Sequence, residues 1–219
     1  MTGNIDVQGM VISSMPIGEY DRRLEILTGD LGKISAFARG ARKPASALVS
    51  VSRPFAFGQF SLYQGKNSYS LSGAKISNYF EDITKDIVTT YYGFYFLELC
   101  SYFCREANPA KEELRLLYQS LRALLSDKFD NRLVRCIFEL KLISLSGYAP
   151  SSDHLNKYAH ISKTAEYTYN FVVNSPVERL YTFRLEEKYL EEFEKICQQL
   201  VSGCTDKEFN SLNLLETVL

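Results

Sequence analysis

The chain has 219 residues, of which 46% are hydrophobic and 23% charged, so it is long enough for one large or two small domains and too apolar for intrinsic disorder. Its net charge of −1 is unevenly spread, because residues 1–80 hold nine lysines and arginines against five acidic residues, whereas residues 81–219 hold 16 against 21. A basic N-terminal part and an acidic C-terminal part predict two surfaces for two kinds of partner.

The cysteine content and the N-terminus predict an intracellular, cytoplasmic protein. Five cysteines, an odd number, favour a reducing compartment, and residues 1–6 lack the charged and apolar pattern of a secretion signal. The longest apolar stretch, residues 91–104, is interrupted by Gly93, Glu98 and Ser101. We therefore expect a buried helix there and no membrane span.

The first eighty residues are predicted to form five short strands. Alternating or continuous apolar runs occur at residues 7–17, 24–27, 34–38, 55–64 and 69–79, separated by turn signals such as those at residues 28–32 and 65–67. Residues 39–54 lack strand character and leave room for a short helix. Five strands with an excursion between the third and fourth are typical of an OB-fold barrel, and an SH3-like barrel is the alternative.

From about residue 82 the apolar residues follow a helical period, at 87–103, at 114–125 after the Asn108-Pro109 start signal, and at 133–145 before Gly147. Residues 148–185 are predicted to be irregular, with a short strand at 167–173. Apparent capping boxes at 175–178 and 205–208 predict two more helices. The expected fold class is α+β, with an OB-fold domain at 1–80 and an all-α helical domain at 81–219.

The sequence argues against an enzyme and against a metal site. The two histidines, His154 and His160, lie in the irregular segment, and the chain lacks a nucleophile elbow, a P-loop and a dinucleotide-binding glycine pattern. Cys100 and Cys104 are one turn apart in an apolar helix, where cysteine packs as a small hydrophobe. The histidines have no cysteine pair beside them, so we expect no zinc there.

The segment at residues 39–43 is the most informative, because it places three cations around a flexible glycine in a loop suited to phosphate contacts. Aromatic residues on the flanking strands add the means to stack bases. Phe37, Phe55 and Phe57 are expected in the barrel core, whereas tyrosine hydroxyls prefer water. The predicted DNA-binding set is Arg22, Arg23, Lys33, Arg39, Arg42, Lys43, Arg53, Lys66, Tyr63 and Tyr69.

Several stretches follow the order and spacing of a known family. They are residues 11–21, 24–33, 38–43 and 53–55 in the first part, and residues 135–143 and 147–150 in the helical part. Over nearly its whole length the chain resembles the bacterial recombination mediator RecO. The resemblance implies an OB-fold and a helical domain that work in recombinational repair. It further implies binding of single- and double-stranded DNA, annealing of complementary strands, association with RecR, engagement of the acidic tail of single-stranded DNA-binding protein (SSB), and help in loading RecA.

Two further expectations depend on this resemblance. Many RecO-like proteins carry a four-cysteine zinc module after the stretch that matches residues 147–150, but residues 151–185 contain no cysteine, so no zinc is expected. The third predicted helix offers Arg132, Arg135 and Lys141 beside apolar residues, and these are the predicted contacts to an acidic, apolar-ended peptide. A protein-interaction adaptor and an RNA-binding OB-fold protein remain the alternatives.

Overall fold

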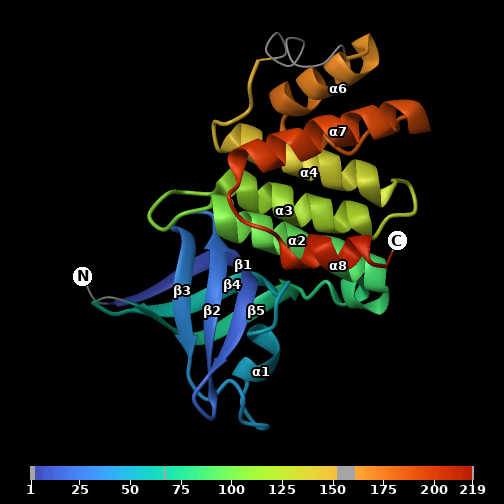
Figure 1. Ribbon diagram of the computed structural model, residues 1–219. Coiled ribbons are helices and arrows are strands. Elements are labelled where there is room, and N and C mark those ends of the chain that lie inside the picture. The colour runs from blue at the N-terminus through green and yellow to red at the C-terminus, as the bar shows by residue number, and fades with distance from the viewer. Residues whose placement is uncertain (1–2, 67, 152–160, 219) are drawn as a thin grey trace. The chain divides into compact units, whose positions relative to one another are not determined.

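The computed structural model describes residues 3–66, 68–151 and 161–218 (Figure 1). The chain forms two compact units. The first comprises Met1–Glu81 together with Cys100–Leu114, and the second comprises Asp82–Leu99 together with Arg115–Leu219. Each unit has its own internal packing.

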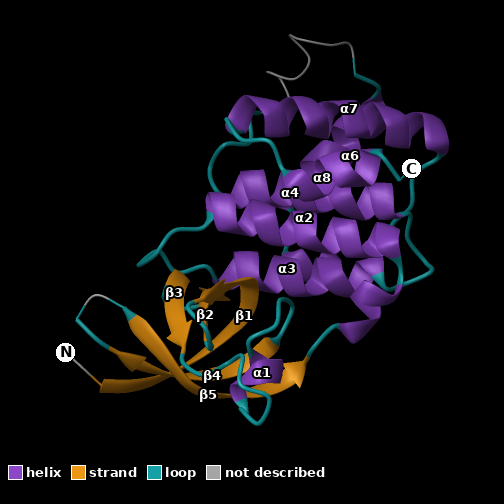
Figure 2. Cartoon of the chain, turned by 60° about the horizontal axis from the view of Figure 1, so that its bottom comes forward, coloured by secondary structure: helices purple, strands orange, loops and turns teal. Residues whose placement is uncertain are grey.

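The first unit contains a closed five-stranded barrel with the strand order β1-β2-β3-β5-β4 (strands in Figure 2). Strands β3 and β5 pair in parallel and the other neighbours are antiparallel. The short helix α1 occupies the excursion between β3 and β4 and contacts β5. This arrangement confirms the predicted OB-fold. The elements are β1 Gly3–Ile17, β2 Asp21–Thr28, β3 Gly32–Ala38, α1 Leu48–Val51, β4 Phe57–Gln64 and β5 Tyr69–Asn78.

The barrel core is filled by every second side chain of each strand, as the alternating pattern predicts. Leu24, Ile26, Ile34 and Phe60 are at most 1% exposed and belong to one apolar cluster. The register of β1 against β2 shifts between Val11 and Ser13, which is the mark of a β-bulge. An extra residue in one strand reverses which side chains face inward, so the second half of β1 presents the opposite set of residues to the core.

The segment from Cys100 to Leu114 belongs to the barrel unit because it fixes the turn between β2 and β3. Backbone bonds join Lys33 N to Arg105 O at 3.1 Å, Ala107 N to Leu31 O at 3.0 Å and Ala110 N to Gly29 O at 2.9 Å. Gly32 has a φ of +69°, and a Cβ atom there would lie 2.1 Å from Arg105 O. Only glycine allows this close approach at a positive φ.

The second unit is helical, and none of the helices in the described ranges is long and apolar enough to cross a membrane. Helix α4 is buried along most of its length and contacts both α6 and α7. It is the central helix that the sequence predicted. The elements, some of which extend into the first unit, are η1 Glu81–Lys85, α2 Ile87–Phe103, α3 Lys111–Leu124, α4 Asn131–Leu145, α6 Lys163–Asn174, η2 Val177–Arg179, α7 Glu187–Cys204 and α8 Asn210–Glu216.

The predicted strand at residues 167–173 is wrong, because these residues belong to a helix within the segment that was predicted to be irregular. Residues 163–174 form α6, whose N-terminus is capped by Ser162. The β-branched and aromatic residues suggested a strand, but burial of Ala165, Thr168, Tyr169 and Val172 follows the helical period.

The predicted helix start signals are also displaced. Residues 177–179 form only one 3-10 turn, α7 begins at Glu187, and α8 begins at Asn210. The Asn108-Pro109 signal likewise precedes α3, which starts at Lys111. Thr205, expected to cap the last helix, instead donates its hydroxyl hydrogen to Val201 O at 2.9 Å, at the end of α7.

Candidate nucleic-acid interface

One row of side chains runs around the outer face of the barrel and includes one residue from each of the five strands. Arg23 pairs with Met15 on β1 and with Phe37 on β3. Phe37 pairs with Ser70 on β5, which in turn pairs with Tyr63 on β4. Directly paired residues share a face of the sheet. Leu24, the residue after Arg23 on β2, points into the core, so Arg23 and the residues paired with it point outward.

The row combines one cation with apolar and aromatic side chains that solvent can reach. Met15 is 50% exposed and Tyr63 is 47% exposed, Arg23 is exposed, and Phe37 is half-buried. Arg23 is oriented by a hydrogen bond from its Nε to Ser35 Oγ at 2.9 Å. Phe37 was predicted to be core and is instead on this face, whereas Phe55 is core as predicted and Phe57 is half-buried. We call Met15, Arg23, Phe37, Ser70 and Tyr63 the barrel row.

The basic loop at residues 39–43 is held against the turn that joins β1 to β2. Gly40 N donates to Asp21 Oδ1 at 2.7 Å, and Arg42 N donates to Tyr20 O at 2.9 Å. The Arg42 guanidinium also reaches Gly18 O at 3.1 Å, and the Lys43 ammonium lies 5.3 Å from the centre of the Tyr20 ring, a cation–π distance. The sequence-distant loop and turn therefore form one site.

This loop adds three exposed cations, Arg39, Arg42 and Lys43, at the end of β3 that follows Phe37. Tyr20 and Ile17 stand beside them and are 44% and 39% exposed. Cations next to exposed apolar and aromatic side chains are the combination that binds single-stranded nucleic acid. The structure thus brings Arg23, Arg39, Arg42, Lys43 and Tyr63 of the predicted set to the outer side of one barrel.

Three members of the predicted set are engaged inside the barrel unit. Tyr69 is only 8% exposed and belongs to the barrel core, so its predicted exposure is wrong. Lys33 donates to Ser101 O at 2.5 Å, and Ser101 Oγ donates to Glu25 at 2.7 Å, which makes Lys33 part of the contact with the 100–114 segment. Arg22 donates to Ser14 Oγ at 3.0 Å, while its Nε is buried without a hydrogen-bond partner among the described residues.

Arg53 and Lys66 are exposed but lie outside the barrel row, after α1 and in the β4–β5 turn. The residues that sequence reasoning missed are Met15, Ile17 and Tyr20. Continuing the inward alternation of Val7 and Val11 would place Met15 in the core, and only the bulge after Val11 turns it outward. The signal was weak because a bulge leaves little trace in one sequence.

The predicted peptide contacts on α4 are used for internal pairing. Arg132 forms ion pairs with Glu194 and, at 2.6 Å, with Glu187, while Arg135 Nη2 lies 2.8 Å from Glu194. The hydrogen bonds that the Arg132 guanidinium donates to Glu194 are the main reason that the pKa of Arg132 is raised. Arg135 is 7% exposed, so it is not the surface cation that was predicted.

Lys141, also 7% exposed, fixes one end of α6. Its ammonium donates to Val173 O at 2.8 Å and to Ser175 O at 2.7 Å, at the C-terminal end of that helix. At the other end, Glu192 accepts hydrogen bonds from Ser162 N and Ser162 Oγ, both at 2.6 Å. A cation at the C-terminus and an anion at the N-terminus both complement the helix dipole.

The helical unit has a different exposed basic site. Arg122, Lys128 and Arg184 line a cavity of about 860 Å³ together with Phe129, Tyr181 and Phe183. Arg184 Nε donates to Lys128 O at 2.8 Å, which holds the 181–185 segment against the loop between α3 and α4. All three cations are exposed, and no ion pair among the described residues involves them. We call this cavity the basic pocket.

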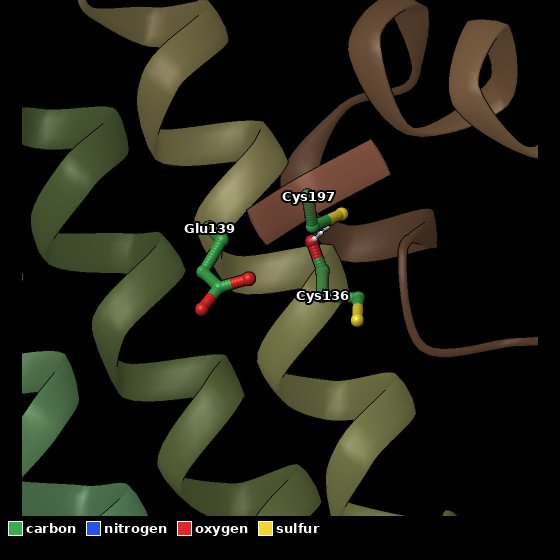
Figure 3. A group of neighbouring side chains, drawn as sticks. All are labelled: Cys136, Glu139 and Cys197. Carbon is green, nitrogen blue, oxygen red and sulfur yellow. Dashed lines mark hydrogen bonds between the residues drawn. The ribbon is translucent and has the colours of Figure 1, made fainter. Parts of the chain in front are cut away.

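One buried group in the described ranges has the composition of a metal site. The ligand atoms of Cys136, Glu139 and Cys197 lie within 4.8 Å of one another (Figure 3). However, Glu139 Oε1 accepts a hydrogen bond from Tyr95 at 2.7 Å and lies 3.7 Å from the Arg135 guanidinium. Burial also raises the pKa of the Cys197 thiol, which donates to Cys136 O at 3.5 Å. A protonated Cys197 thiol beside a fixed guanidinium fits a cation poorly.

A four-cysteine zinc site does not fit this chain either. The segment that would hold it has no cysteine, and α6 is anchored by Lys141, by Glu192 and by the Tyr169 hydroxyl, which donates to Pro150 O at 2.6 Å. His154 and His160 lie outside the described residues. Cys100 and Cys104 are buried and belong to the packing of the barrel unit, consistent with their predicted role as small apolar side chains.

Comparison with known proteins gives one consistent result. The family model described as "Recombination protein O N terminal" matches residues 1–80, and the model "Recombination protein O C terminal" matches residues 84–156. The chain is 28% identical to "DNA repair protein RecO" of Acetivibrio thermocellus over 244 residues, covering 98% of this chain and 97% of that protein. It is 26% identical to the protein of the same name from Clostridium perfringens, with 98% of each chain covered.

A third relative is more similar over a shorter stretch. The "DNA repair protein RecO" of Caldicellulosiruptor saccharolyticus is 34% identical over 146 residues, which cover 67% of this chain and 59% of that protein. The two family models follow the order of the barrel and the helices described above. Because sequence matches and the OB-fold barrel agree, the chain belongs to the RecO family of DNA repair proteins.

Proposed function

We propose that this protein is a non-enzymatic recombination mediator that binds single- and double-stranded DNA through the barrel row and the basic loop. It acts at the bacterial nucleoid in the cytoplasm, anneals complementary strands, and works with RecR to help load RecA onto DNA coated by SSB. It needs no zinc or other cofactor for this role. The observation that supports the proposal best is the barrel row, which aligns Arg23, Phe37 and Tyr63 across neighbouring strands.

The chemistry of this surface suits DNA of any sequence. The exposed cations neutralise phosphates and release counterions, and this contribution does not depend on the bases. The rings of Phe37 and Tyr63 offer faces for base stacking, worth about 1–3 kcal/mol per base, which is also tolerant of sequence. Contacts to the phosphates and base faces leave the pairing edges of the bases available. A protein that holds strands in this way can bring two complementary strands together.

The basic pocket supports a second binding role, for an acidic peptide with apolar residues. We propose that it takes the acidic tail of SSB, in place of the predicted contacts at Arg132, Arg135 and Lys141. The cations Arg122, Lys128 and Arg184 complement carboxylates, and the aromatic walls suit an apolar chain end. A labelled acidic peptide should bind the protein, and the triple change Arg122→Ala, Lys128→Ala and Arg184→Ala should weaken binding at least about tenfold. Undiminished binding by this variant would rule out the basic pocket.

An annealing assay tests the main function. Complementary oligonucleotides coated with SSB should anneal faster with the protein, and the change Arg42→Ala with Lys43→Ala should remove most of that acceleration. Lys75→Ala is the matched control, because Lys75 is an exposed cation on β5 outside the barrel row. Absence of both annealing and DNA binding would support the adaptor alternative. Preferential binding of RNA in direct competition would support the RNA-binding alternative.

A further inference from the structure

A second cavity of the helical unit has the opposite charge to the basic pocket. It measures about 520 Å³ and is formed by the start of α2, the end of α3, the α3–α4 loop and the start of α4. Its lining contains the four exposed aspartates Asp82, Asp86, Asp127 and Asp130. Ser126 and Phe129 line both cavities, so the α3–α4 loop separates an acidic site from a basic one. We call the second cavity the acidic pocket.

The carboxylates of the acidic pocket are only partly neutralised within the chain. Asp86 caps α2 through Thr89, and the hydrogen bond from the Thr89 backbone lowers its pKa, so it is ionised at neutral pH. Asp130 caps α4 by accepting from Arg132 N at 2.8 Å, and Asp82 pairs with Lys85. Asp127 makes no ion pair within the described part of the chain. The Arg132 guanidinium at the rim is already paired with Glu187 and Glu194.

A tyrosine hydroxyl in this pocket has no hydrogen-bond partner among the described residues. Tyr92 is 1% exposed and lines the cavity, yet no hydrogen bond joins its hydroxyl to another described residue. Because Tyr92 lines the cavity and its hydroxyl is not among the fully enclosed unpaired atoms of the described chain, the geometry points to a hydroxyl that faces the cavity. A hydrogen-bonding group left in an almost enclosed position is unfavourable unless a water or a ligand satisfies it. Leu124, Leu125 and Phe129 supply apolar walls around it.

The geometry limits the class of ligand. In the part of the chain that the structure describes, these aspartates do not form a group close enough to hold a metal ion together. Four carboxylates also repel nucleic acid. A long cationic side chain with neighbouring apolar residues fits this lining. Its charge would pair with the aspartates, its N–H groups would donate to the Tyr92 hydroxyl, and the apolar residues would pack on Leu124, Leu125 and Phe129.

We propose that the acidic pocket is a docking site for a basic peptide segment of a partner protein, with an arginine or lysine inserted toward Tyr92. Charge complementarity and the open hydroxyl of Tyr92 carry this proposal. None of its lining residues belongs to the proposed DNA-binding surface, and it shares only Ser126 and Phe129 with the basic pocket. It gives the acidic half of the chain a partner of its own, distinct from DNA and from an acidic tail.

A labelled peptide of the composition Ac-GLRKLRFG-NH2 tests the proposal on the full chain by fluorescence anisotropy at low salt. We expect saturable binding that weakens with added salt, and binding weaker by roughly tenfold after Asp82→Asn with Asp127→Asn, since neither residue caps a helix. Tyr92→Phe should weaken it roughly threefold. The matched control is Glu191→Gln with Glu208→Gln, which removes two exposed carboxylates of the same unit from outside the pocket. The control should bind as the unchanged protein does.

Several outcomes would overturn the proposal. The first is that the pocket variant and the control bind the peptide equally well. The second is that a peptide with glutamine at its three cationic positions binds as tightly as the basic peptide. The third is that spermidine displaces the peptide at equal or lower concentration, which would indicate a polyamine site. If the protein self-associates and the pocket variant does not, the site would instead be assigned to a second copy of the chain. Circular dichroism and thermal unfolding of each variant confirm that the fold is retained before binding is compared.

Discussion

Replacing Lys141 by methionine tests whether α6 is held in place by a buried cation. The side chain donates hydrogen bonds to Val173 O and Ser175 O and is 7% exposed. Hydrogen bonds to charged groups contribute about 1.5–3 kcal/mol each, but methionine keeps most of the apolar volume and avoids the cost of burying an ammonium group. We therefore expect Lys141→Met to lower the free energy of unfolding by about 2–4 kcal/mol.

Urea denaturation of the full chain, followed by far-ultraviolet circular dichroism, measures this change. Hydrogen exchange then locates it, because amides of α6 should lose protection before those of α4. Lys195→Met is the matched control, since Lys195 is an exposed lysine on α7. Loss of less than about 0.5 kcal/mol, the range of ordinary surface substitutions, would refute the reasoning. Unchanged exchange in α6 would refute it equally.

Three further predictions address the barrel and the absence of zinc. Gly32→Ala should lower the free energy of unfolding by about 2 kcal/mol or more, because Gly32 has a positive φ and lies against the carbonyls of the 105–108 segment. Gly73 has open space around it, so Gly73→Ala should be nearly neutral. Thermal unfolding of the two variants measures the difference. Tyr63→Ala should weaken binding to short single strands by about 1–3 kcal/mol, and Tyr69→Phe should leave it unchanged if the fold is kept, as anisotropy titrations would show. A chelator should leave the unfolding temperature unchanged, and a clear decrease would indicate a bound metal ion.

The barrel could be predicted because its sequence repeats the local rules of a sheet. Leu24 and Ile26, or Ile34 and Ala36, alternate with polar residues, and the glycines of the β2–β3 turn separate the runs. The basic loop was equally visible as a cluster of cations. What could not be predicted was the outward position of Met15, because the bulge near Val11 depends on how β1 pairs with its neighbours.

The site predictions failed where a distant partner decides the role of a side chain. Lys33 and Lys141 look like surface cations in the sequence, yet the first reaches Ser101 and the second reaches the end of α6. Arg135 has its carboxylate partner Glu194 on another helix. Separations of 32 to 68 residues along the chain lie beyond any local pattern. The predicted exposure of Tyr69 was wrong for a simpler reason. Its hydroxyl suggested contact with solvent, whereas its ring packs in the barrel core.

The salt dependence of binding to single-stranded DNA tests the central claim most directly. Each phosphate contact on a single strand contributes about 0.7 to the slope of log affinity against log salt concentration. The account predicts that Arg42→Ala with Lys43→Ala lowers the magnitude of this slope by about 1.4, and that Lys75→Ala lowers it far less. An unchanged slope in a folded double variant would contradict the claim that this barrel surface grips the DNA backbone.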